Sequence, residues 1–229
     1  MSLKKQAKAG RDRLQGGIYV VINPIVRLLI ALHITPNMVT TIGFLGNAVA
    51  ALVLVVAALE CPEAGPQYAM ITLTGALVIG FSLFDMLDGQ VARLGNMMST
   101  FGAMYDSVLD RYCELLTLGA IAFYFCTLGF YAGAVAAFLA LVGSIMVSYV
   151  RARAEGLGIE CKIGFMQRPE RVVVTAAALL ATGICGQCRV DFDPNWILFG
   201  GMAIIAVFAN LTAFARIEHC RRQLLNASK

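Results

Sequence analysis

Long apolar stretches constrain the fold of this chain more than any other feature of its sequence. Windows of about 20 apolar residues, the length that crosses the hydrocarbon core of a bilayer, centre on residues 38–59, 67–87, 102–128, 131–150, 171–187 and 195–215. Of the 229 residues, 59% are hydrophobic and 14% are charged, which is more apolar surface than one soluble core can bury. We therefore predict an all-α integral membrane protein with six transmembrane helices in a single domain.

The region before the first predicted span divides into a basic arm and an amphipathic segment. Residues 1–17 carry five Lys and Arg residues and lack the apolar core of a signal peptide. Residues 18–33 mix apolar and polar positions and are too short to span, so we expect either a helix in the membrane interface or a plain lead-in. Thr35 and Pro36 fit an N-cap and a first helical turn. The expected divisions are 1–33, the six-helix bundle 34–217, and a tail, 218–229.

Basic residues set the predicted orientation, because Lys and Arg near short loops are retained in the cytoplasm. Of the 18 Lys and Arg residues, only Arg189 falls in a segment that six spans with a cytoplasmic N-terminus would place outside. Both termini and the turn between the second and third spans are then cytoplasmic, in a multi-pass protein of the cell membrane. Basic ends also favour anionic lipid headgroups. We expect no nucleic-acid partner.

Two of the seven cysteines, Cys185 and Cys188, lie close together in the predicted outer loop. A disulfide could form there if that compartment is oxidising. A metal site would need two further ligands, which the loop does not supply. We interpret this pair as incidental or as a disulfide.

Four carboxylates interrupt the apolar background. They form two pairs, with spacings of three and four residues that put each pair on one face of a helix: Asp85 with Asp88, and Asp106 with Asp110. Between the pairs, Gly95-Asn96 is a turn signal that would return the second helix beside the first. Four converging carboxylates repel one another unless hard cations stabilise them. We therefore predict that the four aspartates hold divalent metal ions.

A glycine and an arginine beside the first pair indicate phosphoryl chemistry. Gly89 leaves room for a ligand to approach the backbone, and Arg93 offers a cation for phosphate. The whole run resembles the complete signature of the CDP-alcohol phosphotransferase (phosphatidyltransferase) family: Asp85-x2-Asp88-Gly89-x2-Ala92-Arg93-x8-Gly102-x3-Asp106-x3-Asp110. The resemblance implies two Mg²⁺ or Mn²⁺ ions on the four aspartates and a homodimer. The CDP-lipid contacts that we expect are Asn37, Thr40, Asp88, Gly89, Arg93 and Ser99.

A second region resembles one branch of that family, the phosphatidylinositol phosphate synthases. Residues 148–155 (SYVRARAE) and 167–171 (QRPER) are similar to runs with which that branch binds the phosphate of inositol phosphate. Two positions differ, because Arg151 stands where the branch has lysine and Gln167 where it has glutamate. Arginines at the end of a span also serve as interfacial anchors, and that interpretation stays open. The acceptor contacts that the resemblance implies are Ser148, Arg151, Arg153, Arg168, Arg171 and Arg216.

The predicted reaction is transfer of the phosphatidyl group of CDP-diacylglycerol to a polar alcohol, with inositol 1-phosphate favoured and CMP released. By the same resemblance, Asp110 accepts the proton of the acceptor hydroxyl. A phosphatidylglycerophosphate synthase or phosphatidylinositol synthase of the same family remains open. So do an ion-coupled transporter and a membrane prenyltransferase, since intramembrane carboxylates serve both. Transport predicts inverted repeats and interrupted helices, neither of which the sequence shows, and prenyltransferases carry their aspartate motifs on well-separated helices, whereas these four fall within 26 residues.

Overall fold

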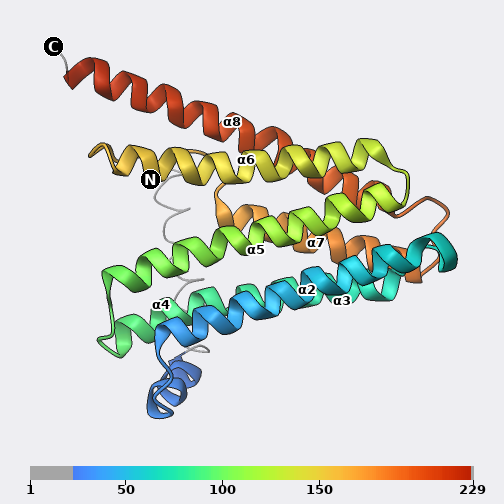
Figure 1. The fold of residues 1–229 in the computed structure, drawn as a ribbon, viewed down its shortest axis with the longest axis horizontal. Coiled ribbons are helices and arrows are strands. Elements are labelled where there is room, and N and C mark those ends of the chain that lie inside the picture. The colour runs from blue at the N-terminus through green and yellow to red at the C-terminus, as the bar shows by residue number, and fades with distance from the viewer. Residues whose placement is uncertain (1–22, 228–229) are drawn as a thin grey trace, which may run out of the picture. The chain divides into compact units, whose positions relative to one another are not determined.

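The computed structural model describes residues 23–227, and within that range the chain is all-helical, without strands. Residues 23–31 form a helix that covers part of the predicted interfacial segment; the remainder of that segment lies outside the described residues. The longer helices, in chain order (Figure 1), are α2 (Pro36–Ala64), α3 (Tyr68–Ser82), α4 (Phe84–Leu94), α5 (Thr100–Thr127), α6 (Tyr131–Glu155), α7 (Arg168–Gln187) and α8 (Asn195–Ala227).

Five helical segments of the described chain are long and apolar enough to cross a membrane. They are Pro36–Ala64, Tyr68–Leu94, Tyr131–Glu155, Arg168–Gln187 and Asn195–Asn226. The predicted all-α membrane fold is therefore confirmed, but the count of six spans is not. The remaining predicted span corresponds to α5, whose 28 residues include Asp106, Asp110, Arg111 and Glu114. These charged side chains distinguish α5 from the five other segments, each of which contains a stretch of 18 residues with at most two charged side chains.

The second predicted span is interrupted. A turn at Leu83 ends α3 at Ser82, and α4 begins at Phe84, whereas the sequence predicted one continuous helix over 67–87. The Leu83 carbonyl accepts hydrogen bonds from the amides of Met86 and Leu87, at 3.0 and 3.2 Å. The break separates an apolar helix from a short amphipathic one that carries the first aspartate pair. The apolar window that located this span, 67–87, includes Leu83 and ends within α4, so hydropathy alone gave no sign of the break.

The other helix boundaries extend the predicted windows by a few residues. Thr35 behaves as the expected N-cap, since its Oγ1 accepts a hydrogen bond from the Met38 amide at 3.4 Å. At the far end of α7, Cys185 lies within the last turn and Cys188 directly after the helix, and both thiols are free. Cys188 therefore lies in the connection after α7, as predicted, whereas Cys185 lies in the helix. Helix α8 continues through residues 218–227, the segment predicted as a tail.

The chain divides into two compact units. The first comprises the described residues up to Gly43 together with Leu83–Leu109, and the second comprises Phe44–Ser82 together with the described residues from Asp110 onward. The core of the first unit is small: Val26, Val39 and Val91 are almost fully buried. The second unit has the larger core, in which Tyr124 and Phe125 are fully buried.

Within the second unit, α6 packs along α8, α3 packs along α7, and α7 also contacts α8 (Figure 1). Glycines allow the close α3–α7 approach, because a Cβ on Gly183 would overlap Thr72 Oγ1 and lie 2.8 Å from the Tyr68 carbonyl oxygen. Gln187 Nε2 also donates to Thr72 Oγ1 at 2.6 Å across the same interface. Small residues with an interhelical hydrogen bond are the usual basis of helix association in membranes.

This packing predicts that Gly183→Ala destabilises the second unit. Overpacking costs about 1–3 kcal/mol, which exceeds the roughly 1 kcal/mol that alanine gains over glycine in a helix. Gly80→Ala on α3 is the matched control, because a Cβ there meets no atom within 4 Å. We expect a lower melting temperature in detergent for Gly183→Ala and an unchanged or higher one for Gly80→Ala. Equal melting temperatures for the two variants would show that the α3–α7 contact is not tight.

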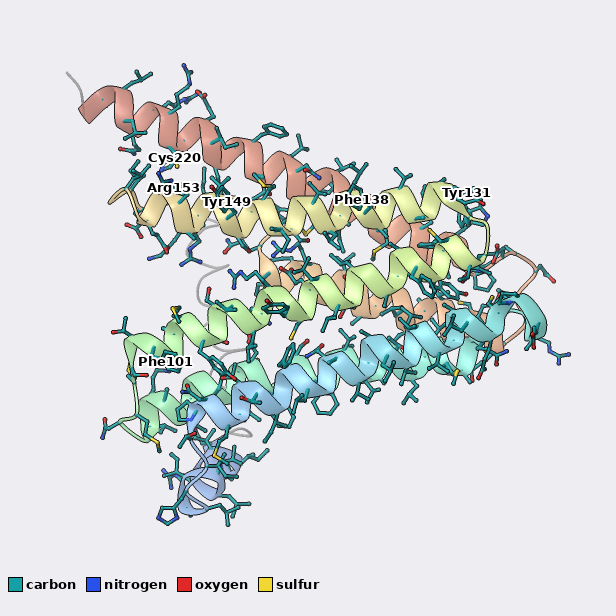
Figure 2. All side chains as sticks on the ribbon, in the orientation of Figure 1. Phe101, Tyr131, Phe138, Tyr149, Arg153 and Cys220 are labelled. Carbon is teal, nitrogen blue, oxygen red and sulfur yellow. The ribbon has the colours of Figure 1, made fainter. Side chains whose placement is uncertain are left out.

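Exposed aromatic side chains on α6 fit a lipid-facing surface. Tyr131, Phe138 and Tyr149 project outward from this helix (Figure 2), and each is more than half exposed. Tyr131 and Tyr149 are 18 residues apart, about 27 Å along an α-helix. That separation is close to the thickness of the hydrocarbon core, and tyrosines are enriched at both membrane interfaces.

Candidate functional site

Three of the four predicted metal ligands meet in the first unit. Asp85 and Asp88 lie on α4 and Asp106 on the first turns of α5, and one carboxylate oxygen from each lies within 4.8 Å of the others. The turn between the helices contains Asn96, whose φ of 50° is the left-handed conformation that asparagine tolerates well. The predicted return of α5 beside α4 thus brings Asp106 of the second aspartate pair to both members of the first pair.

The chemistry of this donor set fits a hard divalent cation. Three carboxylates at such separations repel one another, and oxygen ligands of this kind are those preferred by Mg²⁺ and Mn²⁺. Asp88 is buried, and its Oδ2 accepts a hydrogen bond from Thr40 Oγ1 at 2.6 Å. This bond orients the carboxylate, as hydrogen bonds to metal-ligating side chains do.

The fourth predicted ligand, Asp110, is not one of this group of three. It follows Asp106 by one helical turn on α5, within the second unit. Its Oδ1 lies 2.6 Å from Arg168 Nη2, and its Oδ2 lies 3.5 Å from Arg111 Nη1. An ionised Asp110 is therefore stabilised by arginine. Its coordination of a metal stays a prediction.

A cavity of about 210 Å³ adjoins the aspartates within the first unit. Its lining combines Asp88 and Asp106 with residues from α2, from α4 and from the turn into α5. All six predicted CDP-lipid contacts line it: Asn37, Thr40, Asp88, Gly89, Arg93 and Ser99. Residues that are 62 positions apart in the chain therefore share one pocket with the aspartates.

Gly102 of the signature has a steric role in this cavity. A Cβ at this position would lie 3.0 Å from Ser99 Oγ and 3.1 Å from Asn37 Oδ1. The Gly102 amide donates to Ser99 Oγ at 2.9 Å, so Ser99 caps the start of α5. Glycine thus lets the helix start approach Asn37 closely.

The predicted acceptor residues lie in the second unit, in and around the loop between α6 and α7. Arg151 Nε donates to Glu155 at 2.9 Å near the end of α6, Arg153 is exposed, and Ser148 is half-buried. Arg216 of α8 donates to the carbonyl oxygens of Ile163 and Val147 at 2.8 and 2.6 Å.

Three of these arginines, from three different helices, lie around the α6–α7 loop. Arg171 and Arg216 donate to the Met166 and Ile163 carbonyl oxygens of that loop, and Arg216 also bonds the Val147 carbonyl oxygen, one turn before Arg151. Arg171 is almost fully buried and pairs with Glu114 of α5, and Arg151 pairs with Glu155. Arg216 is bonded to carbonyl oxygens, so its positive charge favours an anionic ligand.

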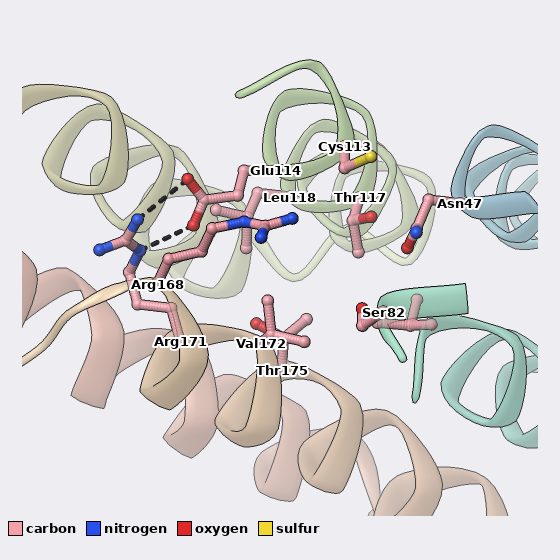
Figure 3. A pocket seen from close by; sticks show the side chains of 11 residues that line it. Asn47, Ser82, Cys113, Glu114, Thr117, Leu118, Arg168, Arg171, Val172 and Thr175 are labelled. Atoms are coloured by element: carbon pink, nitrogen blue, oxygen red, sulfur yellow. Dashed lines mark hydrogen bonds and ion pairs between the residues drawn. The ribbon is translucent and has the colours of Figure 1, made fainter. Parts of the chain in front are cut away.

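Two features of the site were missed by the sequence analysis. Thr40 was predicted only as a nucleotide contact, yet it hydrogen-bonds Asp88. Glu114 was not singled out, although it follows Asp110 by four residues and so continues the same carboxylate face of α5. Glu114, Arg168 and Arg171 border a second, small cavity of about 30 Å³, which polar and apolar side chains line together and which has room for a water molecule (Figure 3).

Sequence comparison with known proteins identifies the family to which the chain belongs. Residues 33–212 match the CDP-alcohol phosphatidyltransferase family. The chain therefore belongs to this family of transferases, and with its apolar helices it is a multi-pass membrane protein. A phosphatidylinositol phosphate synthase of Cutibacterium acnes is 31% identical over 216 residues, covering 92% of this chain and 97% of that protein.

Solved structures show the same fold. A crystal structure of Mycobacterium tuberculosis phosphatidylinositol phosphate synthase with CDP-DAG bound matches with a TM-score of 0.74 at 27% identity, covering 87% of this chain and 93% of that one. A second structure of the same enzyme, in complex with manganese and citrate, matches with a TM-score of 0.72 at 27% identity, covering 87% and 88%.

Proposed function

We propose that this protein transfers the phosphatidyl group of CDP-diacylglycerol to inositol 1-phosphate, forming phosphatidylinositol phosphate and CMP. The observation that carries the proposal is the cavity of the first unit, where the six expected nucleotide contacts adjoin the aspartate group. The names of the relatives, which are phosphatidylinositol phosphate synthases, support the choice of acceptor. The arginines around the α6–α7 loop of the second unit suit the phosphate of that acceptor.

The residues have distinct tasks in this reaction. Gly89 and Arg93 would admit and orient the pyrophosphate, and Asn37 and Thr40 would contact the nucleotide. The acceptor hydroxyl oxygen attacks the lipid-linked phosphorus, its proton passes to Asp110, and the bond to the CMP oxygen breaks with its electron pair. Two divalent ions, Mg²⁺ or Mn²⁺, held by Asp85, Asp88, Asp106 and Asp110, would neutralise charge on the attacking and leaving oxygens.

The proposal extends to topology and assembly. We infer six spans in one domain, because α5 with 28 residues reaches about 42 Å, enough to cross a bilayer despite its charged first half. The distribution of Lys and Arg supports cytoplasmic termini and a cytoplasmic active site. Resemblance to the family supports a homodimer.

An acceptor panel with CDP-diacylglycerol tests the proposed function. Inositol 1-phosphate should release CMP faster than free inositol, glycerol 3-phosphate or serine. Preference for glycerol 3-phosphate or free inositol would assign the chain to another activity of the same family. Absence of CMP release with every acceptor would contradict CDP-diacylglycerol as the donor.

Arg151→Gln tests the acceptor site, because Arg151 is half-exposed and its loss leaves no buried orphan charge. Losing a charge-assisted hydrogen bond of about 1.5–3 kcal/mol should raise the KM for inositol 1-phosphate roughly tenfold to a hundredfold. The KM for CDP-diacylglycerol should barely change. Arg221→Gln, in an exposed ion pair near the end of α8, is the matched control. If Arg151→Gln alters both KM values alike, the arginine is a membrane anchor.

A further inference from the structure

Two ion pairs, one helical turn apart, link α5 to α7. On α5, Asp110 and Glu114 are four residues apart; on α7, Arg168 and Arg171 are three apart, so each helix presents both groups on one face. Asp110 pairs with Arg168 at 2.6 Å, and Glu114 pairs with Arg171. Asp110 and both arginines belong to the proposed reaction, whereas Glu114 has no assigned role.

The Glu114–Arg171 ion pair is bidentate and buried. Arg171 Nε donates to Glu114 Oε1 at 2.7 Å and Nη2 donates to Oε2 at 3.0 Å, while the two side chains are 2% and 7% exposed. A buried ion pair of this kind does not by itself imply a gain in stability, because desolvation offsets the attraction. Its geometry, however, holds the planar guanidinium in one orientation.

The same guanidinium is tied to the α6–α7 loop. Arg171 Nη1 donates to the Met166 carbonyl oxygen at 3.1 Å, and the Met166 amide donates to Thr212 Oγ1 of α8 at 3.3 Å. Met166 is buried and lies two residues before Arg168, at the start of α7. Arg171 thus connects Glu114 of α5 to the end of the α6–α7 loop, two residues before Arg168.

Figure 3 shows that the guanidinium groups of Arg168 and Arg171 point in different directions. The Arg171 guanidinium is aligned with the Glu114 carboxylate. Three of the five N–H donors of Arg171 are used in the bonds given above. The other two are therefore held in directions that Glu114 sets.

We propose that Glu114 is a positioning residue of the acceptor site, which orients Arg171 and, through Met166, the start of α7 for a phosphorylated acceptor. This inference rests on the proposed function for the identity of the acceptor. Glu114 does not touch the substrate. It preorganises the N–H donors of Arg171, so that binding of the acceptor does not have to order them.

Two substitutions separate the effect of the negative charge of Glu114 from the effect of its side-chain length. Glu114→Gln removes the charge at nearly constant shape, and Glu114→Asp keeps the charge but withdraws it by one methylene group. Both variants should raise the KM for inositol 1-phosphate at least about tenfold, as expected when a charge-assisted bond is misplaced, and leave the KM for CDP-diacylglycerol within about twofold. Glu218→Gln, which removes an exposed acid from the end of α8, is the matched control and should change neither KM.

Hydrogen exchange provides a readout that requires no substrate. Amides of residues 160–167 should exchange faster in both Glu114 variants than in the wild type, while those in the α6–α8 contact should keep their protection. If Glu114→Gln does not fold, the acceptor KM and the loop exchange rate of Glu114→Asp test the inference instead. The inference is overturned if the melting temperature falls with the acceptor KM unchanged, if both KM values rise alike, or if loop exchange stays at the wild-type rate. If the wild type uses no phosphorylated acceptor, the proposed function is wrong. The exchange rate of the loop amides still shows whether Glu114 holds the α6–α7 loop in place.

Discussion

Asp88→Asn should reduce turnover at least about a hundredfold and weaken Mn²⁺ binding. Substituting residues around metal ligands typically costs 10–100-fold, and Asp88 is itself the most buried member of the aspartate group. The amide keeps the shape and the contact with Thr40 but removes the negative charge from the shared site. Turnover is measured as CMP release, and metal affinity by titration with Mn²⁺ followed by electron paramagnetic resonance.

Asp85→Asn and Asp106→Asn should behave alike, because all three carboxylates belong to one group. Asp191→Asn is the control, since that aspartate is exposed in the α7–α8 connection. Excess EDTA should abolish activity of the wild type. Wild-type turnover in any of the three variants, or full activity in EDTA, would remove the metal assignment.

Asp110→Asn should depress the chemical step far more than CDP-lipid affinity. A general base contributes about 10²–10⁴-fold to a rate, so we expect kcat to fall within that range while the Kd for CDP-diacylglycerol changes little. The asparagine cannot accept the proton of the acceptor hydroxyl. Single-turnover CMP release gives the chemical step, and equilibrium binding of labelled CDP-diacylglycerol gives the affinity.

The ion pair with Arg168 makes a second comparison informative. Arg168→Gln removes the charge nearest to Asp110, at 2.6 Å, but leaves the carboxylate in place. Loss of catalysis in Asp110→Asn that exceeds the loss in Arg168→Gln indicates that the carboxylate acts in proton transfer. Equal losses of CDP-lipid binding and turnover in Asp110→Asn would make the residue mainly a metal ligand.

The predictions that succeeded from sequence rest on local patterns. Windows of apolar residues located every long helix to within about a turn or two, apart from the break at Leu83 and the extension of α8. Aspartate spacings of three and four, with a turn between them, were enough to predict that Asp85, Asp88 and Asp106 would meet. Such patterns are readable because an α-helix repeats every 3.6 residues and a hairpin turn returns the chain beside itself.

Long-range pairings could not be predicted in this way. Thr40 and Asp88 are 48 residues apart in the chain, and Glu114 and Arg171 are 57 apart. A threonine within an apolar helix, or an acid one turn beyond a signature, has several available partners until the helices pack. Burial then makes an unpaired polar group costly, so the packed arrangement selects one partner for each.

The sequence by itself determined the membrane class, the family signature and the aspartate pairs, because helical periodicity and spacing act over one or two turns. Tertiary structure alone decided that Thr40 orients Asp88, that Asp110 meets Arg168, and that Arg171 turns its guanidinium to Glu114 and Met166. Folding alone brings Thr40 of α2 to Asp88 of α4, and Asp110 and Glu114 of α5 to the arginines of α7, within hydrogen-bond distance. In an apolar interior, a charged side chain without such a partner would be too costly to keep.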